Sequence, residues 1–264
     1  MSYGSTPYTA PPPAYDEEAN RPMYGSNDDD DMYKETIANS SKEIRLRNLI
    51  KVPTSLEFVR KVYSILATQL AATSALSAFY MFNDSARSWV QSNQWMLIVS
   101  MISTIIVMLA LFWKARSYPL NYGLLAIFTL LEAHAVGTIV TFYKQTIVLQ
   151  ALLITLGVFI GLTIFTLQSK WDFSGMGPFL YAGIWILLIA GIVQIFLPFS
   201  KGVQLALAIG GVIIFSGYIL FDTYLIFNQY SAEDYIIASV SLYLDVINLF
   251  LRILQVLSLL SDDN

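Results

Sequence analysis

Cysteine is absent from this sequence, and His134 is its single histidine in 264 residues. The lack of cysteine excludes disulfides, thiolate catalysis and cysteine-bound metals. One histidine cannot supply the imidazoles of a typical catalytic zinc site, so zinc-dependent membrane hydrolases are excluded and no cofactor is expected. Charged residues are also scarce: they make up 13% of the chain, compared with about 25% in soluble domains.

The few charges are unevenly placed along the chain. Residues 1–42 hold eight acidic and three basic residues, whereas the rest holds eleven acidic and twelve basic residues. The net charge of −4 therefore comes from the first segment (−5 against +1), and the remainder offers no basic face for nucleic acid. Residues 1–42 also lack the apolar core of a signal peptide and the apolar content needed for folding. We expect a disordered tail over 1–42.

A proline-rich motif lies within this tail. Pro12, Pro13 and Tyr15 fit the Pro-Pro-x-Tyr pattern, in which a polyproline II segment docks on the aromatic groove of a WW domain. A ubiquitin ligase with WW domains is therefore a candidate partner. The alternative is a plain Pro-rich tail without a docking function.

Seven long apolar stretches follow a juxtamembrane segment over 43–57. Residues 54–57 have the spacing of a capping box, which predicts the start of a helix. Each stretch reaches the roughly 20 residues that cross about 30 Å of hydrocarbon as a helix. The predicted spans are 58–82, 95–113, 119–142, 147–167, 177–197, 202–227 and 235–260. The sequence thus predicts an all-α integral membrane protein with a seven-helix domain over 58–264, embedded in a lipid bilayer.

The distribution of Lys and Arg near the spans predicts the orientation. One set of helix ends carries nine: Lys42, Arg45, Arg47, Lys51, Arg60, Lys61, Lys114, Arg116 and Lys170. The other set carries three: Arg87, Lys144 and Lys201. Nine against three predicts a cytosolic N-terminus, and an odd number of spans then places the C-terminus on the lumenal side. Seven-helix receptors have the opposite orientation.

Two carboxylates fall inside the last two predicted spans, where ionisable groups are costly and usually functional. Asp222 lies about six residues before the loop at 228–234 and Asp245 about ten after it, or roughly 9 and 15 Å deep. If they meet, they would share one proton, and its loss would push the helices apart as a pH-sensitive latch. When ionised, the pair is a candidate transient Ca²⁺ site. The alternative is a structural clamp.

Three further polar groups lie at membrane depth. Glu132 either adds a third carboxylate to a cation route or stays neutral against a backbone carbonyl. Arg252 lies seven residues after Asp245, on nearly the same helix face. It either offsets the acidic charge or extends to the far interface. His134 is expected to be a packed polar residue.

Three segments together resemble one family of membrane proteins. They read LYLDVINLFL at 242–251, LFDTYLI at 220–226 and LEAHAVG at 131–137. These motifs are similar to those of the transmembrane Bax-inhibitor-motif family, in its lifeguard branch and especially its fungal members. The resemblance covers residues 43–264, and the segment 242–251 is its most specific part.

The resemblance implies a fold in which six helices surround a central C-terminal helix. It implies a pH-dependent Ca²⁺ leak across an organelle membrane, with Asp222 and Asp245 as the pH sensor. It also implies a role in programmed cell death and the unfolded protein response, with cell-death regulators as partners. The endoplasmic reticulum is the expected location, with vacuole, Golgi and mitochondria as alternatives. An arginine that bacterial members carry in the second helix is absent here.

Two other classes compete with a cation leak. Intramembrane aspartyl proteases also pair aspartates on neighbouring helices, but their Gly-x-Gly-Asp motif is absent, because Asp245 follows Leu242-Tyr243-Leu244. We therefore expect no enzymatic activity. The second rival is a non-conducting adaptor that recruits WW-domain partners through its tail. Deleting residues 1–40 would abolish the adaptor role and spare a leak, whereas changing Asp245 would do the reverse.

Overall fold

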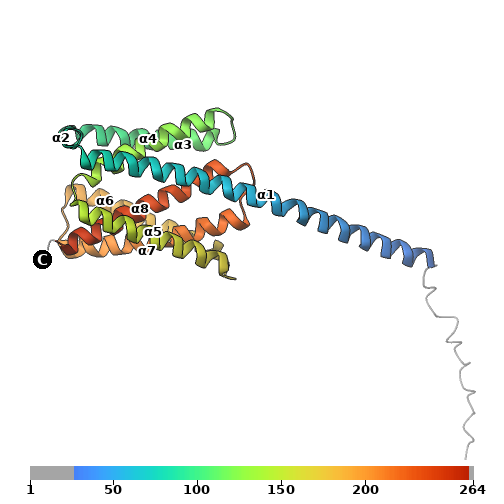
Figure 1. Cartoon of the computed structure of the whole chain (residues 1–264). Coiled ribbons are helices and arrows are strands. Elements are labelled where there is room, and N and C mark those ends of the chain that lie inside the picture. The colour runs from blue at the N-terminus through green and yellow to red at the C-terminus, as the bar shows by residue number, and fades with distance from the viewer. Residues whose placement is uncertain (1–26, 262–264) are drawn as a thin grey trace, which may run out of the picture. The chain divides into compact units, whose positions relative to one another are not determined.

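The computed structural model describes residues 27–261, and every regular element in this range is helical (Figure 1). In chain order the elements are α1 (Asn27–Phe82), α2 (Asp84–Ser92), α3 (Trp95–Lys114), α4 (Leu120–Val140), α5 (Gln145–Gln168), the 3-10 helix η1 (Phe173–Met176), α6 (Gly177–Phe196), α7 (Lys201–Asn228) and α8 (Tyr235–Ser261). The chain divides into two compact units, Met1–Lys51 and Val52–Asn264, and all the membrane-length helical stretches lie in the second unit.

Seven of these stretches are long and apolar enough to cross a membrane, as the sequence predicted. They are Leu56–Phe82, Trp95–Lys114, Leu120–Val140, Gln145–Gln168, Phe173–Phe196, Lys201–Asn228 and Tyr235–Ser261. The largest difference is four residues, at the fifth span, which begins at 173 rather than 177 because η1 precedes α6. Hydropathy and length therefore suffice to place the spans.

The structure differs from the expected tail and from the expected start of the first helix. Residues 27–42 are helical, and α1 continues through the capping-box spacing at 54–57 instead of beginning there. Within this stretch, Thr36 Oγ1 donates to the Met32 carbonyl one turn earlier over 2.8 Å. The prediction of a disordered tail rested on the polar composition of 1–42 as a whole. That average does not show that part of this segment can form a helix. Pro12, Pro13 and Tyr15 lie outside the described residues.

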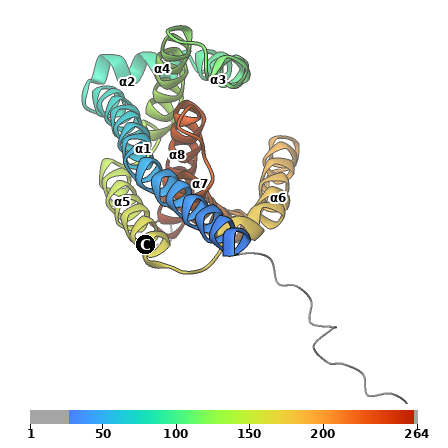
Figure 2. The ribbon, with the colours of Figure 1, turned by 90° about the vertical axis from the view of Figure 1, so that its right-hand side faces the viewer.

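Helix α8 is the most buried span of the bundle. Two thirds of its most apolar window, 67%, is buried, compared with 17% for the windows of α3, α5 and α6. It packs against α7, α5 and α4, whereas α3 packs mainly on α4 and α6 mainly on α7 (Figure 2). The C-terminal helix is thus central as expected, while α3 and α6 lie toward the outside of the bundle.

The connections between the helices lie at two ends of the bundle, and different contacts hold each end together. Each end is named after one of its residues. The Lys144 end holds the connections 83–94, 141–144 and 197–200, and the Arg116 end holds 115–119, 169–172 and 229–234. At the Lys144 end, the predicted connector 83–94 contains the short helix α2. The Asn83 side chain caps α2 by accepting from the Ala86 amide over 2.9 Å.

An ion pair joins two connections at the Arg116 end. Arg116 Nη2 lies 2.7 Å from Asp234 Oδ1, which links the α3–α4 connection to the residue before α8. The pKa of Asp234 lies below its ordinary value, first because Ser231 hydrogen-bonds to its carboxylate and then because of Arg116. These contacts fix the point at which α8 enters the bundle.

Candidate functional site: a buried carboxyl pair between α7 and α8

The structure brings Asp222 of α7 and Asp245 of α8 together inside the bundle. Both side chains are buried, with 7% of each residue exposed. The two carboxyl groups lie within hydrogen-bonding reach of each other. The meeting predicted from helix depth is therefore present, on helices that run side by side (Figure 2).

A proton on one carboxyl decides whether this pair attracts or repels. Two ionised carboxylates at this depth would repel each other and would both lose hydration. With one proton between them, one carboxyl donates a hydrogen bond to the other. Asp245 Oδ2 is buried and has no hydrogen-bond partner within residues 27–261. The protonation of the pair therefore determines whether α7 and the central helix attract or repel each other at this point.

Two tyrosines lie close enough to the pair for the charges to interact. Tyr218 is on α7, and Tyr230 is in the α7–α8 connection. The pKa of Tyr230 is raised to about 12, first by burial and then by the charge of Asp222. Its ring also packs on Phe58 of α1, with centroids 6.5 Å apart. Tyr230 therefore links the pair to helix α1 at the Arg116 end.

Glu132 lies apart from the pair. Its charge acts on Tyr243 of α8, whereas the charge that acts on Asp245 comes from Asp222. No described residue forms a hydrogen bond or an ion pair with Glu132. The structure therefore places a third carboxyl on the other side of α8 and does not make it a third member of the cluster.

Arg252 extends away from the pair. Its aliphatic stem lies on Gly211 of α7, where an added Cβ would stand 2.7 Å from Arg252 Cδ. Its Nη1 donates to Gln255 Oε1 over 3.1 Å, and its charge acts on Tyr143 near the Lys144 end. Arg252 forms no ion pair with Asp245 in the described part of the chain. This geometry matches extension toward an interface rather than charge compensation.

The carboxyl pair by itself offers few ligands to a cation. Within the described range, no group of three or more His, Asp or Glu residues is placed to hold a metal ion. Ca²⁺ takes six to eight oxygen ligands, of which Asp222 and Asp245 supply at most four. A Ca²⁺ ion at the pair would have to complete its coordination with water or backbone carbonyls. Such an incomplete set of protein ligands is typical of weak, transient binding.

Sequence reasoning missed a layer of hydrogen bonds that ties α1 to its neighbours. Thr73 Oγ1 lies 2.8 Å from the hydroxyl of Tyr243, which is fully buried on α8. One turn away, Gln69 Nε2 donates to Thr129 of α4 over 3.0 Å. The polar residues 69, 73 and 77 recur every fourth position in an apolar span, which predicts one inward face. That spacing was the available signal.

His134 makes a similar contact nearer the Lys144 end. Its Nδ1 lies 3.0 Å from the Tyr80 hydroxyl, and the two rings meet edge to face. The Tyr80 ring is seated on Gly137, where an added Cβ would be 2.9 Å from Tyr80 Cδ2. The histidine is a packed polar residue, as expected.

These features define a class: a polytopic α-helical membrane protein with a carboxyl pair against its central helix. The chain belongs to the family described as Inhibitor of apoptosis-promoting Bax1, whose model matches residues 56–262. This match confirms the resemblance drawn from the three sequence motifs.

Individual relatives cover nearly the whole chain. Bax inhibitor 1 of Schizosaccharomyces pombe is 41% identical over 255 residues, which span 96% of this chain and 91% of the relative. Protein lifeguard 4 of Mus musculus is 39% identical, and the Golgi anti-apoptotic protein of Vaccinia virus (strain Lister) is 38% identical. Each of these two alignments spans 88% of this chain and 93% of the relative.

Proposed function

We propose that this protein is a pH-dependent Ca²⁺ leak pathway of an organelle membrane and that it regulates programmed cell death through this leak. The observation that carries the proposal is the contact between Asp222 and Asp245 in the interior of a seven-helix membrane unit. The names of the relatives, Bax inhibitor 1 and Golgi anti-apoptotic protein, support a role in cell death. Regulation of the unfolded protein response would follow from a leak in the endoplasmic reticulum.

The mechanism follows from the protonation of the pair. With one proton, the carboxyls hold α7 against α8 and the route is closed. When that proton is lost, two adjacent negative charges repel and favour a state in which the helices separate. The same two carboxylates then attract a divalent cation. The expected sign is therefore a leak that increases as the pH rises.

The test is Ca²⁺ efflux from proteoliposomes that hold the purified full chain, measured from pH 5 to 8. Wild type is expected to leak with a rate that depends on pH. Asp245→Asn keeps the size of the side chain and removes its charge, so it should flatten the pH profile. Asn248→Ala is a matched control on the same helix, since among the described residues the Asn248 side chain donates only to the Leu244 carbonyl. It should behave like wild type.

Two results would count against the leak. Folded wild-type protein that passes no Ca²⁺ at any pH would leave the aspartates as a structural clamp. An unchanged pH profile in Asp245→Asn would show that another group controls the pathway.

An adaptor role is the second candidate, because Pro12, Pro13 and Tyr15 match a WW-domain ligand. Deleting residues 1–40 distinguishes the two functions. An adaptor would lose both its partner and its effect on cell death, whereas the leak would persist. Tyr15→Ala is the sharper variant, since it removes the motif and leaves the rest of the tail intact.

The orientation and the compartment belong to the same proposal. We infer that the Arg116 end faces the cytosol, with the endoplasmic reticulum as the membrane and the Golgi, vacuole and mitochondria as alternatives. The cysteine-free chain suits cysteine labelling because it has no background. An impermeant maleimide should label Ser169→Cys in cells opened at the plasma membrane alone, and it should label Ser200→Cys only after the organelle is opened too. The reverse pattern would invert the orientation.

A further inference from the structure

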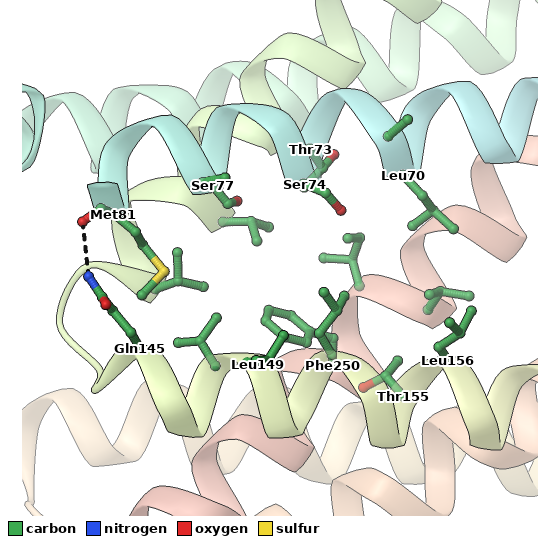
Figure 3. A pocket seen from close by; sticks show the side chains of 18 of the residues that line it. Leu70, Thr73, Ser74, Ser77, Met81, Gln145, Leu149, Thr155, Leu156 and Phe250 are labelled. Carbon is green, nitrogen blue, oxygen red and sulfur yellow. Dashed lines mark hydrogen bonds between the residues drawn. The ribbon is translucent and has the colours of Figure 1, made fainter. Parts of the chain in front are cut away.

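A cavity of about 400 Å³ lies between α1 and α5 (Figure 3). Helix α8 contributes Val246, Ile247 and Phe250 to its wall, and α4 contributes Val136 and Val140. Its volume is within the range of about 300–1,000 Å³ that is common for ligand pockets. The carboxyl pair is not among the residues that line it, so the cavity is a separate feature.

The wall of this cavity has little to offer a polar ligand. Leucine, valine, alanine and other apolar side chains predominate. Two of its hydroxyls are already used within their own helices, because Thr73 donates to the Gln69 carbonyl and Thr155 to the Ala151 carbonyl. Cavities with such walls do not hold water well. The surface therefore fits hydrocarbon.

The cavity is longer than one leaflet of the membrane is thick. It is lined from Leu70 to Phe82 along α1 and from Gln145 to Phe159 along α5. At 1.5 Å per residue these stretches correspond to about 18 and 21 Å, whereas one leaflet contributes about 15 Å of hydrocarbon. Met81 and Gln145 mark one end of the cavity, and Leu70 and Leu156 lie toward the other (Figure 3). The cavity thus extends from the Lys144 end past mid-membrane depth, so it can hold an acyl chain along its length.

The mouth of the cavity is suited to a lipid headgroup. It is closed by one long hydrogen bond, 3.4 Å from Gln145 Nε2 to the Met81 carbonyl. Phe82, beside it, is 73% exposed, as is usual for a side chain in contact with lipid. Lys144 directly precedes Gln145, is exposed, and forms no ion pair within the described residues. A phosphate at this height would meet a cation.

We propose that this cavity binds one acyl chain of a membrane glycerophospholipid, with the lipid phosphate at Lys144. The chain would lie against Val246, Ile247 and Phe250, the part of α8 that directly follows Asp245 in the sequence. A bound lipid would therefore fix the position of the central helix. The site needs only the membrane and the helix packing, so it stands whether or not the protein conducts Ca²⁺.

The experiment uses phosphatidylglycerol that carries a diazirine in the middle of one acyl chain. The full-length protein is reconstituted in liposomes with this lipid and irradiated, and the labelled residues are mapped by peptide mass spectrometry. Label concentrated on cavity residues such as Ser77 and Leu152 is expected. Label spread evenly over outward-facing residues such as Leu153, which is 61% exposed, would overturn the proposal.

Two substitutions on α1 make a matched pair. Ala78 lines the cavity, whereas Ala75 is exposed on the same helix and does not line it. Ala78→Phe places a ring where roughly two methylenes would lie, so labelling of the cavity should fall about tenfold. Ala75→Phe should leave it unchanged. Equal labelling of both variants, each monodisperse and with wild-type helicity, would refute the site.

A second arm tests the headgroup. Lys144→Gln should reduce cavity labelling by the phosphatidylglycerol probe. It should not reduce labelling by a diacylglycerol that carries the same diazirine chain, since that lipid has no phosphate. A loss with both probes, or with neither, would remove Lys144 from the proposal and refute recognition of the phosphate.

Discussion

The hydrogen bond between Thr73 and Tyr243 allows a quantitative test of how α1 is attached to the central helix. Thr73 Oγ1 donates its single proton to the Gln69 carbonyl over 2.9 Å. Tyr243 must therefore be the donor in its 2.8 Å contact with Thr73. Tyr243→Phe removes this donor and keeps the ring, which packs edge to face on Phe128.

The expected loss in the free energy of unfolding follows from the burial of both residues and from the strength of hydrogen bonds between helices in a membrane. Tyr243 is 0% exposed and Thr73 is 3% exposed, so no water replaces the lost bond. Interhelical hydrogen bonds in membranes contribute about 0.6 kcal/mol on average and up to about 1.7 kcal/mol. We expect Tyr243→Phe to lower the free energy of unfolding by about 1 kcal/mol. Thr73→Val should cost about 1–3 kcal/mol, because it leaves the tyrosine hydroxyl buried without an acceptor.

The assay is a double-mutant cycle with Tyr243→Phe, Thr73→Val and the double variant. Unfolding is followed in mixed micelles with increasing sodium dodecyl sulfate. The two substitutions should couple by about 1 kcal/mol, since the second costs less once the first has removed its partner. Strictly additive effects, with a coupling below about 0.3 kcal/mol, would show that this bond does not hold α1 to α8.

Two other contacts give simpler predictions. The pKa of Asp234 is lowered mainly by its hydrogen bond with Ser231, so this carboxylate stabilises the fold above its ordinary pKa of 3.8, and the contribution is lost as the pH falls through the lower folded pKa. The melting temperature of Asp234→Asn should therefore lie below that of wild type at pH 6 and approach it toward pH 2.5; a constant gap would contradict this. Gly137→Ala would overlap the ring of Tyr80 and should cost about 1–3 kcal/mol. Gly123→Ala, with nothing within 4 Å of its Cβ, should be neutral or stabilising.

The central helix takes part in three separate features of the bundle. Asp245 meets Asp222 of α7, Tyr243 meets Thr73 of α1, and Val246 is part of the wall of the α1–α5 cavity. These residues are within four positions of one another and point in different directions around α8. A shift of α8 at one contact would therefore displace the residues at the other two. If so, the substitution Ala78→Phe in the cavity should change the rate of the Ca²⁺ leak relative to wild type.

The sequence alone determined the spans and the depth of the ionisable groups. A bilayer demands about 20 apolar residues for each helix, so hydropathy placed all seven spans to within four residues. The rise of a helix is constant, so residue counting placed Asp222 and Asp245 at depths where they could meet. The motif at 242–251 indicated the family that the comparison confirmed. Local composition was less informative, since residues 27–42 read as a disordered tail and are helical.

The tertiary structure alone decided which faces of the helices meet. Each residue turns a helix by about 100°, so depth does not say what a side chain faces. Rotation about α4 directs Glu132 toward Tyr243 and not toward the aspartates, and packing against Gly211 directs Arg252 to Gln255. The cavity between α1 and α5 depends on the spacing of two helices whose lining residues are at least 63 positions apart in the sequence, from Phe82 to Gln145 (145 − 82). The rotation of each helix about its axis and the distance between helices depend on side-chain packing among all the helices at once. The hydropathy pattern along the sequence therefore does not predict them.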